Sequence, residues 1–63
     1  MLPSYKKMDG ATRAQLESGY FDAKAGRSAP YEDDPEAYKI GFDAGLFGYS
    51  LEEAVDHWFD EQD

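Results

Sequence analysis

The segment SLEEAVDHWFDE, residues 50–61, decides the fold because it combines a helix start signal with a helical apolar period. Ser50 and Glu53 form the Ser-x-x-Glu pattern of a capping box, in which the two side chains accept hydrogen bonds from each other's backbone N–H groups. Apolar residues recur at the spacing of a core-facing helical stripe, at Leu51, Ala54, Val55, Trp58 and Phe59. The segment therefore predicts an amphipathic helix over about residues 50–62.

The opposite face of this predicted helix is acidic, with carboxylates at Glu52, Glu53, Asp56, Asp60 and Glu61. The like-charged i, i+4 pair Glu52 and Asp56 destabilises a helix by about 0.2 to 0.5 kcal/mol. Asp60 and Glu61 lie at the negative end of the helix dipole, where cations are favoured. Because local rules are most often broken at functional sites, these carboxylates are the first candidates for a binding surface.

Two more helices are bounded by residues that start and stop helices. The first covers about residues 11–25 and ends before Gly26, in the left-handed position that terminates many helices. The second covers about residues 35–47, where Asp34 is a suitable N-cap and Pro35 suits the first helical position. Together with the C-terminal segment, these signals predict an all-α domain of three helices.

Glycines predict how the first two helices pack. Gly41 and Gly45 lie one turn apart inside the second predicted helix, although each glycine costs about 1 kcal/mol relative to alanine there. Such a stripe indicates close approach by another element. The face of the first helix that carries Gly19 and Ala23 is the simplest partner.

Length and composition limit the function. A chain of 63 residues is one domain at most, so we expect a single domain over residues 1–63, with residues 1–9 as a flexible N-terminal arm. No cysteine is present to form a disulfide or a thiolate metal site. No segment has the apolar length of a signal peptide or a membrane span, so we expect a soluble cytoplasmic protein without a membrane partner.

The charge is distributed unevenly. Residues 28–63 contain eleven of the fourteen carboxylates and a single base, Lys39, whereas residues 1–27 have a small positive net charge. Concentrated like charge destabilises a compact state through self-repulsion. A net charge of −8 that opposes folding in this way indicates a strongly basic protein partner.

Catalytic and metal-binding chemistry is weakly represented. His57 is the only histidine and has no serine at helical spacing, so a solvated surface histidine is the preferred interpretation. The acidic run from Glu32 to Glu36 lacks the glycine and the alternating ligands of a calcium loop. We therefore expect no enzymatic activity, no metal site and no cofactor.

The acidic surface itself points to nucleic-acid mimicry. Successive helical turns place carboxylates about 5 to 6 Å apart, a spacing of the same order as that of phosphates on a nucleic-acid strand. Such an array fits a basic groove that normally binds DNA. A second group of carboxylates supplements it in the predicted loop and helix start, at Glu32, Asp33, Asp34 and Glu36. The alternative is an acidic face that only confers solubility.

In size, charge and lack of catalytic groups, the chain resembles the small phage-borne anti-CRISPR proteins that occlude the DNA-binding channel of an interference complex. This class-level resemblance implies a basic nucleic-acid-binding protein as partner, such as a type I CRISPR interference complex. It also implies no direct binding of nucleic acid, no cofactor and no reaction.

A second resemblance rests on short motifs. The pairs Gly19-Tyr20, Pro30-Tyr31 and Gly41-Phe42, with an Ala-Gly turn between the first two, are similar to the ribosome modulation factor family over residues 16–45. This implies two packed helices joined by a Pro-Tyr turn. The family is basic and contacts ribosomal RNA, whereas phosphate repels a chain of net charge −8.

Two other functions stay open at this point. One is a ribosome-associated modulator of the ribosome modulation factor type. The other is a structural or assembly protein that uses exposed aromatic residues such as Tyr5 and Tyr49. The sequence is compatible with a monomer or a homodimer.

Overall fold

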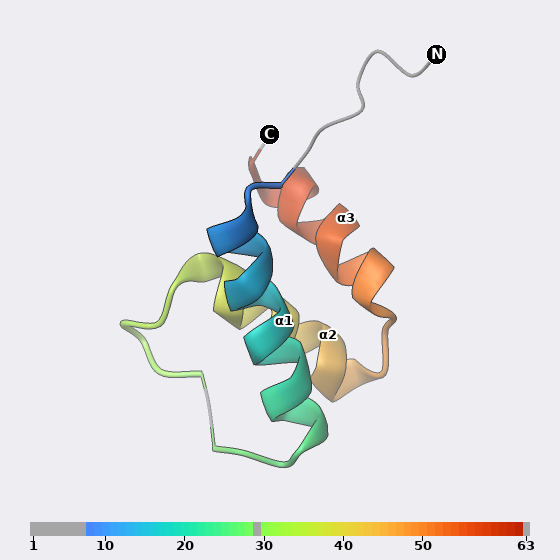
Figure 1. The fold of residues 1–63 in the computed structure, drawn as a ribbon. Helices are drawn as coiled ribbons and strands as arrows, with labels where there is room; N and C mark the ends of the chain where they lie inside the picture. Colours follow the sequence, from blue (N-terminus) through green and yellow to red (C-terminus); the bar gives the residue numbers. More distant parts are fainter. Residues whose placement is uncertain (1–7, 29, 63) are drawn as a thin grey trace.

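The computed structural model describes residues 8–28 and 30–62, and this part of the chain folds into three helices without strands. They are α1 (Gly10–Lys24), α2 (Glu36–Phe47) and α3 (Leu51–Gln62). Figure 1 shows α1 and α2 side by side, with a long connection that returns to the start of α2, and α3 running back along the pair. The predicted all-α three-helix fold is confirmed, and each helix boundary lies within one residue of its predicted place.

The helix ends follow local sequence signals, with one exception. Asp9 caps α1 by accepting from the Thr12 N–H, and Gly26 and Gly48 have positive φ angles of 79° and 83° after α1 and α2. The prediction that Asp34 caps α2 is wrong: Pro35 holds the cap position without a side-chain hydrogen bond. The Asp34 carboxylate instead accepts from the Tyr31 N–H at 2.7 Å, which closes the turn before the helix.

The predicted N-terminal arm lies only partly within the described residues. Residues 1–7, including Tyr5, lie outside them, as do Ala29 and Asp63. Met8 packs against the hydrophobic core, and Asp9 belongs to the start of α1. Residues 8 and 9 therefore contact the folded domain. The predicted arm over residues 1–9 otherwise lies outside the described residues.

Glycine contacts hold α1 against α2, as the Gly41 and Gly45 stripe predicts. A Cβ atom at Gly41 would overlap the backbone of Leu16, whose carbonyl carbon would be 2.8 Å away. A Cβ atom at Gly45 would be 2.5 Å from the Tyr20 carbonyl oxygen. These contacts progress in the same order along both helices, so α1 and α2 run in the same direction and the connection must cross back between them.

The core is built from small and aliphatic side chains together with the buried ring of Phe42. Leu16 of α1 is completely buried, and around it lie Ala37, Ile40 and Ala44 of α2 and Ala54 of α3. Within α2 the buried stripe runs along the alanine and glycine positions, because these let α1 approach closely. Leu46 follows Phe42 by one helical turn, but it lies beyond this stripe and is 59% exposed, whereas Phe42 is buried.

The α3 helix joins this core through its predicted apolar stripe. The capping box is confirmed: the Ser50 N–H donates to the Glu53 carboxylate at 2.8 Å, and the Glu53 N–H donates to Ser50 Oγ at 3.1 Å. Ala54 is fully buried, whereas Trp58 is partly buried against the core. In the part of the chain that the structure describes, no helix has the length and apolar character needed to cross a membrane.

Replacing Trp58 by alanine is expected to lower the free energy of unfolding by about 2 to 4 kcal/mol, because the indole covers the core from α3. The matched control is His57→Ala at the exposed neighbouring position, where we expect a change within about 0.5 kcal/mol. Urea denaturation followed by circular dichroism measures both changes. Equal stability of Trp58→Ala and the parent would contradict the packing described here.

Candidate functional site

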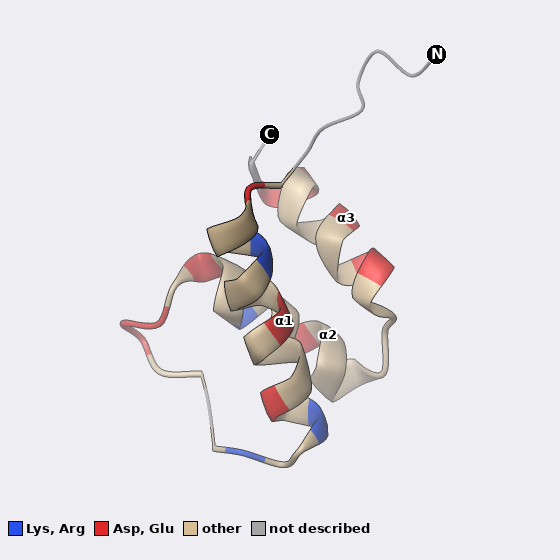
Figure 2. Ribbon diagram, in the orientation of Figure 1, with Lys and Arg blue, Asp and Glu red and all other residues tan. Residues whose placement is uncertain are grey.

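The predicted acidic face is present on α3. The carboxylates of Glu52, Glu53, Asp56, Asp60 and Glu61 are all exposed. Figure 2 shows red segments along α3, with no blue segment on that helix. Glu61 lies 3.5 Å from Nε2 of His57, and the Glu53 carboxylate takes part in the capping box. The remaining three side chains project from the fold without a described hydrogen bond or ion pair.

Basic side chains within the described residues are engaged elsewhere. Arg13 pairs with Glu17 at 2.8 Å, and Arg27 lies 3.2 Å from Asp22. Lys39 donates to the backbone carbonyl of Glu32 at 2.8 Å. No lysine or arginine within residues 8–28 and 30–62 therefore pairs with a carboxylate of α3.

The second predicted group of carboxylates lies apart from the first. Glu32, Asp33 and Asp34 belong to the connection before α2, and Glu36 is the first residue of that helix. In Figure 2 this region is separated from α3 by the α1–α2 pair. Asp34 is already used in the turn with Tyr31. The structure thus presents two acidic regions on different sides of the molecule and does not merge them into one array.

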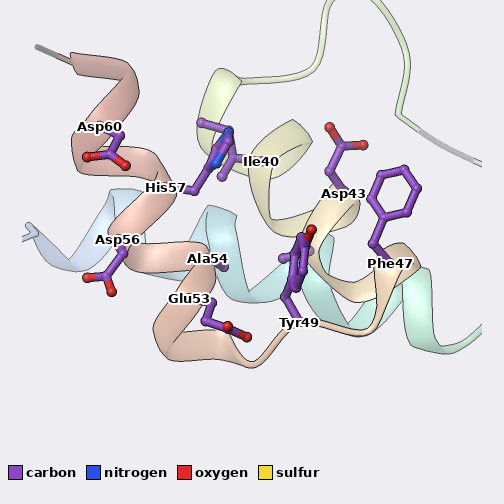
Figure 3. A pocket seen from close by; sticks show the side chains of 10 residues that line it. Ile40, Asp43, Phe47, Tyr49, Glu53, Ala54, Asp56, His57 and Asp60 are labelled. Atoms are coloured by element: carbon purple, nitrogen blue, oxygen red, sulfur yellow. The ribbon is translucent and has the colours of Figure 1, made fainter.

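A groove of about 440 Å³ lies between α2 and α3. Its floor is formed by Ile40, Ala44 and Ala54, which are all buried. Figure 3 shows the residues around this floor, which come from both helices and from the turn that joins them. The remaining lining residues are Asp43, Phe47, Tyr49, Glu53, Asp56, His57 and Asp60.

Two exposed lining residues of this groove, Asp43 and Phe47, were not recognised as site residues from the sequence, and Tyr49 was named only as an exposed aromatic residue for the assembly alternative. Asp43 is a lone carboxylate on α2, and nothing in the helical period shows that it faces α3. Phe47 and Tyr49 flank the turn at Gly48 and remain 68% and 54% exposed, with ring centroids 6.5 Å apart. The backbone at Tyr49 is fixed, because its carbonyl oxygen accepts from the Tyr20 hydroxyl at 2.8 Å.

A second hollow, of about 450 Å³, lies where the α1–α2 connection meets both helices. There the Tyr38 hydroxyl donates to the Asp22 carboxylate, and this hydrogen bond raises the pKa of Tyr38 to about 12. Arg27 contacts the other oxygen of the same carboxylate. Through Asp22, these contacts connect α1 to α2 and to the residues that follow α1, so they have a structural role in the hollow.

This hydrogen bond predicts a loss of stability at alkaline pH. The unfolded chain releases the Tyr38 proton near the ordinary tyrosine pKa of about 10, whereas the folded chain holds it up to about pH 12. The contribution to stability is therefore complete below about pH 10 and is lost as the pH rises toward about 12. We expect Tyr38→Phe to flatten this part of the profile, measured as urea midpoints against pH. Identical profiles for the two proteins would contradict the assignment.

The comparisons with known proteins add no further constraint on the site. No protein family, curated protein or solved structure that was searched matches this chain. In residues 8–28 and 30–62, no group of three potential metal ligands is placed to hold an ion. The candidate site is thus a surface of exposed carboxylates that no described lysine or arginine pairs with, beside an apolar groove. This arrangement is suited chemically to binding a cation.

Proposed function

We propose that this protein is an acidic inhibitor that occupies a basic nucleic-acid-binding surface of another protein and thereby excludes nucleic acid from it. The observation that carries the proposal is the row of exposed α3 carboxylates that no described lysine or arginine neutralises. In this role the protein acts by occupancy rather than by catalysis, and it needs no cofactor.

The geometry of α3 supports mimicry of a phosphate backbone. Glu52, Asp56 and Asp60 follow one another at i, i+4 spacing on a regular helix, so they rise by about 6 Å per step along its axis. The capping box and the packing of Ala54 hold this helix in place. Charges on a rigid element lose little conformational entropy on binding, which favours a tight electrostatic complex.

An acidic face that only confers solubility is the main alternative. Solubility alone does not require the carboxylates to be concentrated on one helix while the described lysines and arginines make their contacts on other elements. Scattered charge of both signs gives solubility with less self-repulsion. The concentration of carboxylates on α3 therefore favours a basic partner.

The proposed setting is a phage-encoded anti-CRISPR protein acting in the cytoplasm of the host cell, with a type I interference complex as target. The decisive experiment is competition: the purified protein is expected to displace labelled duplex DNA from such a complex at stoichiometric amounts. Failure to displace DNA from any basic nucleic-acid-binding protein captured from the host would overturn the proposed function.

The protein itself is expected to have no measurable affinity for DNA or RNA at about 0.15 M salt, because net negative charge is repelled by phosphate. An electrophoretic mobility assay with duplex DNA and with ribosomal RNA measures this. Sedimentation of the protein with ribosomal particles would instead favour the ribosome-associated modulator, the second proposed function.

The Gly19 and Gly41 motifs behind the resemblance to the ribosome modulation factor family lie at the α1–α2 contact, where helix packing alone accounts for them.

A further inference from the structure

The α2–α3 groove has chemistry that the row of α3 carboxylates lacks. Its floor is apolar, and the exposed rings of Phe47 and Tyr49 lie at one end. Figure 3 shows these rings and Asp43 on the α2 side of the groove, with His57 on the α3 side. A ligand in the groove would therefore meet apolar surface, aromatic rings and carboxylates together.

The carboxylates that line the groove are largely uncommitted. Glu53 accepts from the Ser50 N–H in the capping box. Asp43, Asp56 and Asp60 have no hydrogen bond or ion pair among the described residues. Among the described residues, no lysine or arginine lines the groove, and His57 is the one basic side chain in the lining. The lining is thus complementary to a cation and not to an anion.

Charge also limits what can occupy the groove. A second copy of this chain would bring together two molecules of net charge −8, which repel each other. A wholly apolar ligand would remove carboxylates from water without pairing them, which costs free energy. An arginine satisfies both parts of the lining, because its stem covers apolar surface while its guanidinium pairs with carboxylates and stacks on aromatic rings.

We propose that the α2–α3 groove binds a segment of the partner protein in which arginine alternates with large apolar side chains. The guanidinium lies beside Asp43 and the carboxylates of the α3 rim, and an apolar neighbour packs on Phe47 and Tyr49. The groove volume of about 440 Å³ falls within the range of about 300 to 1,000 Å³ that is usual for ligand sites. This inference rests on the proposed function for the identity of the partner as a basic protein.

A synthetic peptide tests the groove without the natural target. The probe is acetyl-Gly-Leu-Arg-Trp-Arg-Leu-Gly-amide, and binding to the full chain is followed by nitrogen-15 NMR and by calorimetry. We expect amide shifts concentrated at the lining residues of α2 and α3. Two control peptides separate the forces: one has glutamine in place of arginine, and the other has glycine in place of leucine and tryptophan. Each control is expected to bind at least about tenfold more weakly.

Matched variants locate the site. Phe47→Ser and Asp43→Asn change exposed residues of the lining, and each is expected to weaken peptide binding by roughly tenfold. Leu46→Ser removes a comparably exposed apolar side chain next to Phe47 but outside the groove, and Glu17→Gln removes a carboxylate on α1. We expect both control variants to bind within about a factor of two of the parent.

Several results would overturn the groove proposal. They are absence of peptide binding, shifts spread over all acidic residues, equal binding of the glycine-substituted peptide, and equal losses in the lining and control variants. Concentration-dependent shifts of the free protein at the same residues would identify a second copy as the occupant instead. None of these results depends on displacement of DNA, so the groove proposal can fail while the proposed function holds, and the reverse is also true.

Discussion

Replacing Gly41 by alanine is expected to remove more than half of the stability of this domain. A Cβ atom at this position would overlap the Leu16 carbonyl group, so α1 and α2 would have to separate along their whole contact. Backbone atoms on both sides form this contact, and no flexible side chain can move to relieve it. Overpacking of this kind costs about 3 kcal/mol or more, against a total stability of about 5 kcal/mol for a small domain.

The expected loss of stability in Gly41→Ala is opposite to the gain that helix propensity alone predicts, so the measurement distinguishes the two. Alanine is favoured over glycine inside a helix by about 1 kcal/mol, so a gain in stability would show that the two helices do not touch. Gly10→Ala is the matched control, because a Cβ atom there meets nothing within 4 Å at the start of α1. We expect that variant to be more stable by up to about 1 kcal/mol. Thermal denaturation followed by circular dichroism compares both variants with the parent.

Gly19→Ala provides an independent check of the same contact from α1. Its Cβ atom would overlap the Tyr38 carbonyl oxygen and would be 2.9 Å from the Phe42 backbone nitrogen. The double variant with Gly41→Ala should cost less than the two single effects together, because one separation of the helices relieves both overlaps. Additive losses would show that the two glycines act at separate contacts.

The sequence predicted the helices and their closest contact because these depend on short-range patterns. The capping box and the apolar period defined α3, and two glycines inside a helix required close approach by a neighbour. Asp34 was misassigned because an aspartate before a helix can either cap that helix or close the preceding turn. In the structure its carboxylate accepts a hydrogen bond from the Tyr31 N–H and closes the turn. The two roles differ in the backbone conformation of the residues before Pro35, which holds the cap position of α2.

The candidate site was only partly accessible from the sequence. The α3 carboxylates follow from helical spacing, and the structure places them on the exposed side of that helix. The groove depends on how α2 and α3 are oriented relative to each other, which brings Asp43 and Phe47 beside residues of α3. That orientation is set by the fully buried Ala54 against the α2 stripe, a long-range packing feature without a local sequence signal.

Reversing the charge of Glu52, Asp56 and Asp60 to lysine is expected to abolish competition with DNA for the proposed target. All three residues are exposed and none takes part in the capping box, so helix formation should persist, as circular dichroism can verify. Each reversal replaces attraction by repulsion at a basic surface, and together they should weaken binding by roughly a hundredfold or more. Parent binding should also fall steeply with salt, since charges are screened beyond about 10 Å at 0.1 M.

A second triple variant distinguishes local contact from net charge. Reversing Glu32, Asp33 and Glu36 to lysine changes the net charge by the same amount, but does so in the acidic region on the other side of the α1–α2 pair. If α3 makes the contact, this variant loses only long-range steering, so its association rate falls while its complex persists. If both triple variants lose DNA competition equally, net charge rather than contact through α3 accounts for binding. Unchanged competition by the α3 variant, with its fold intact, would move the binding surface away from α3 altogether.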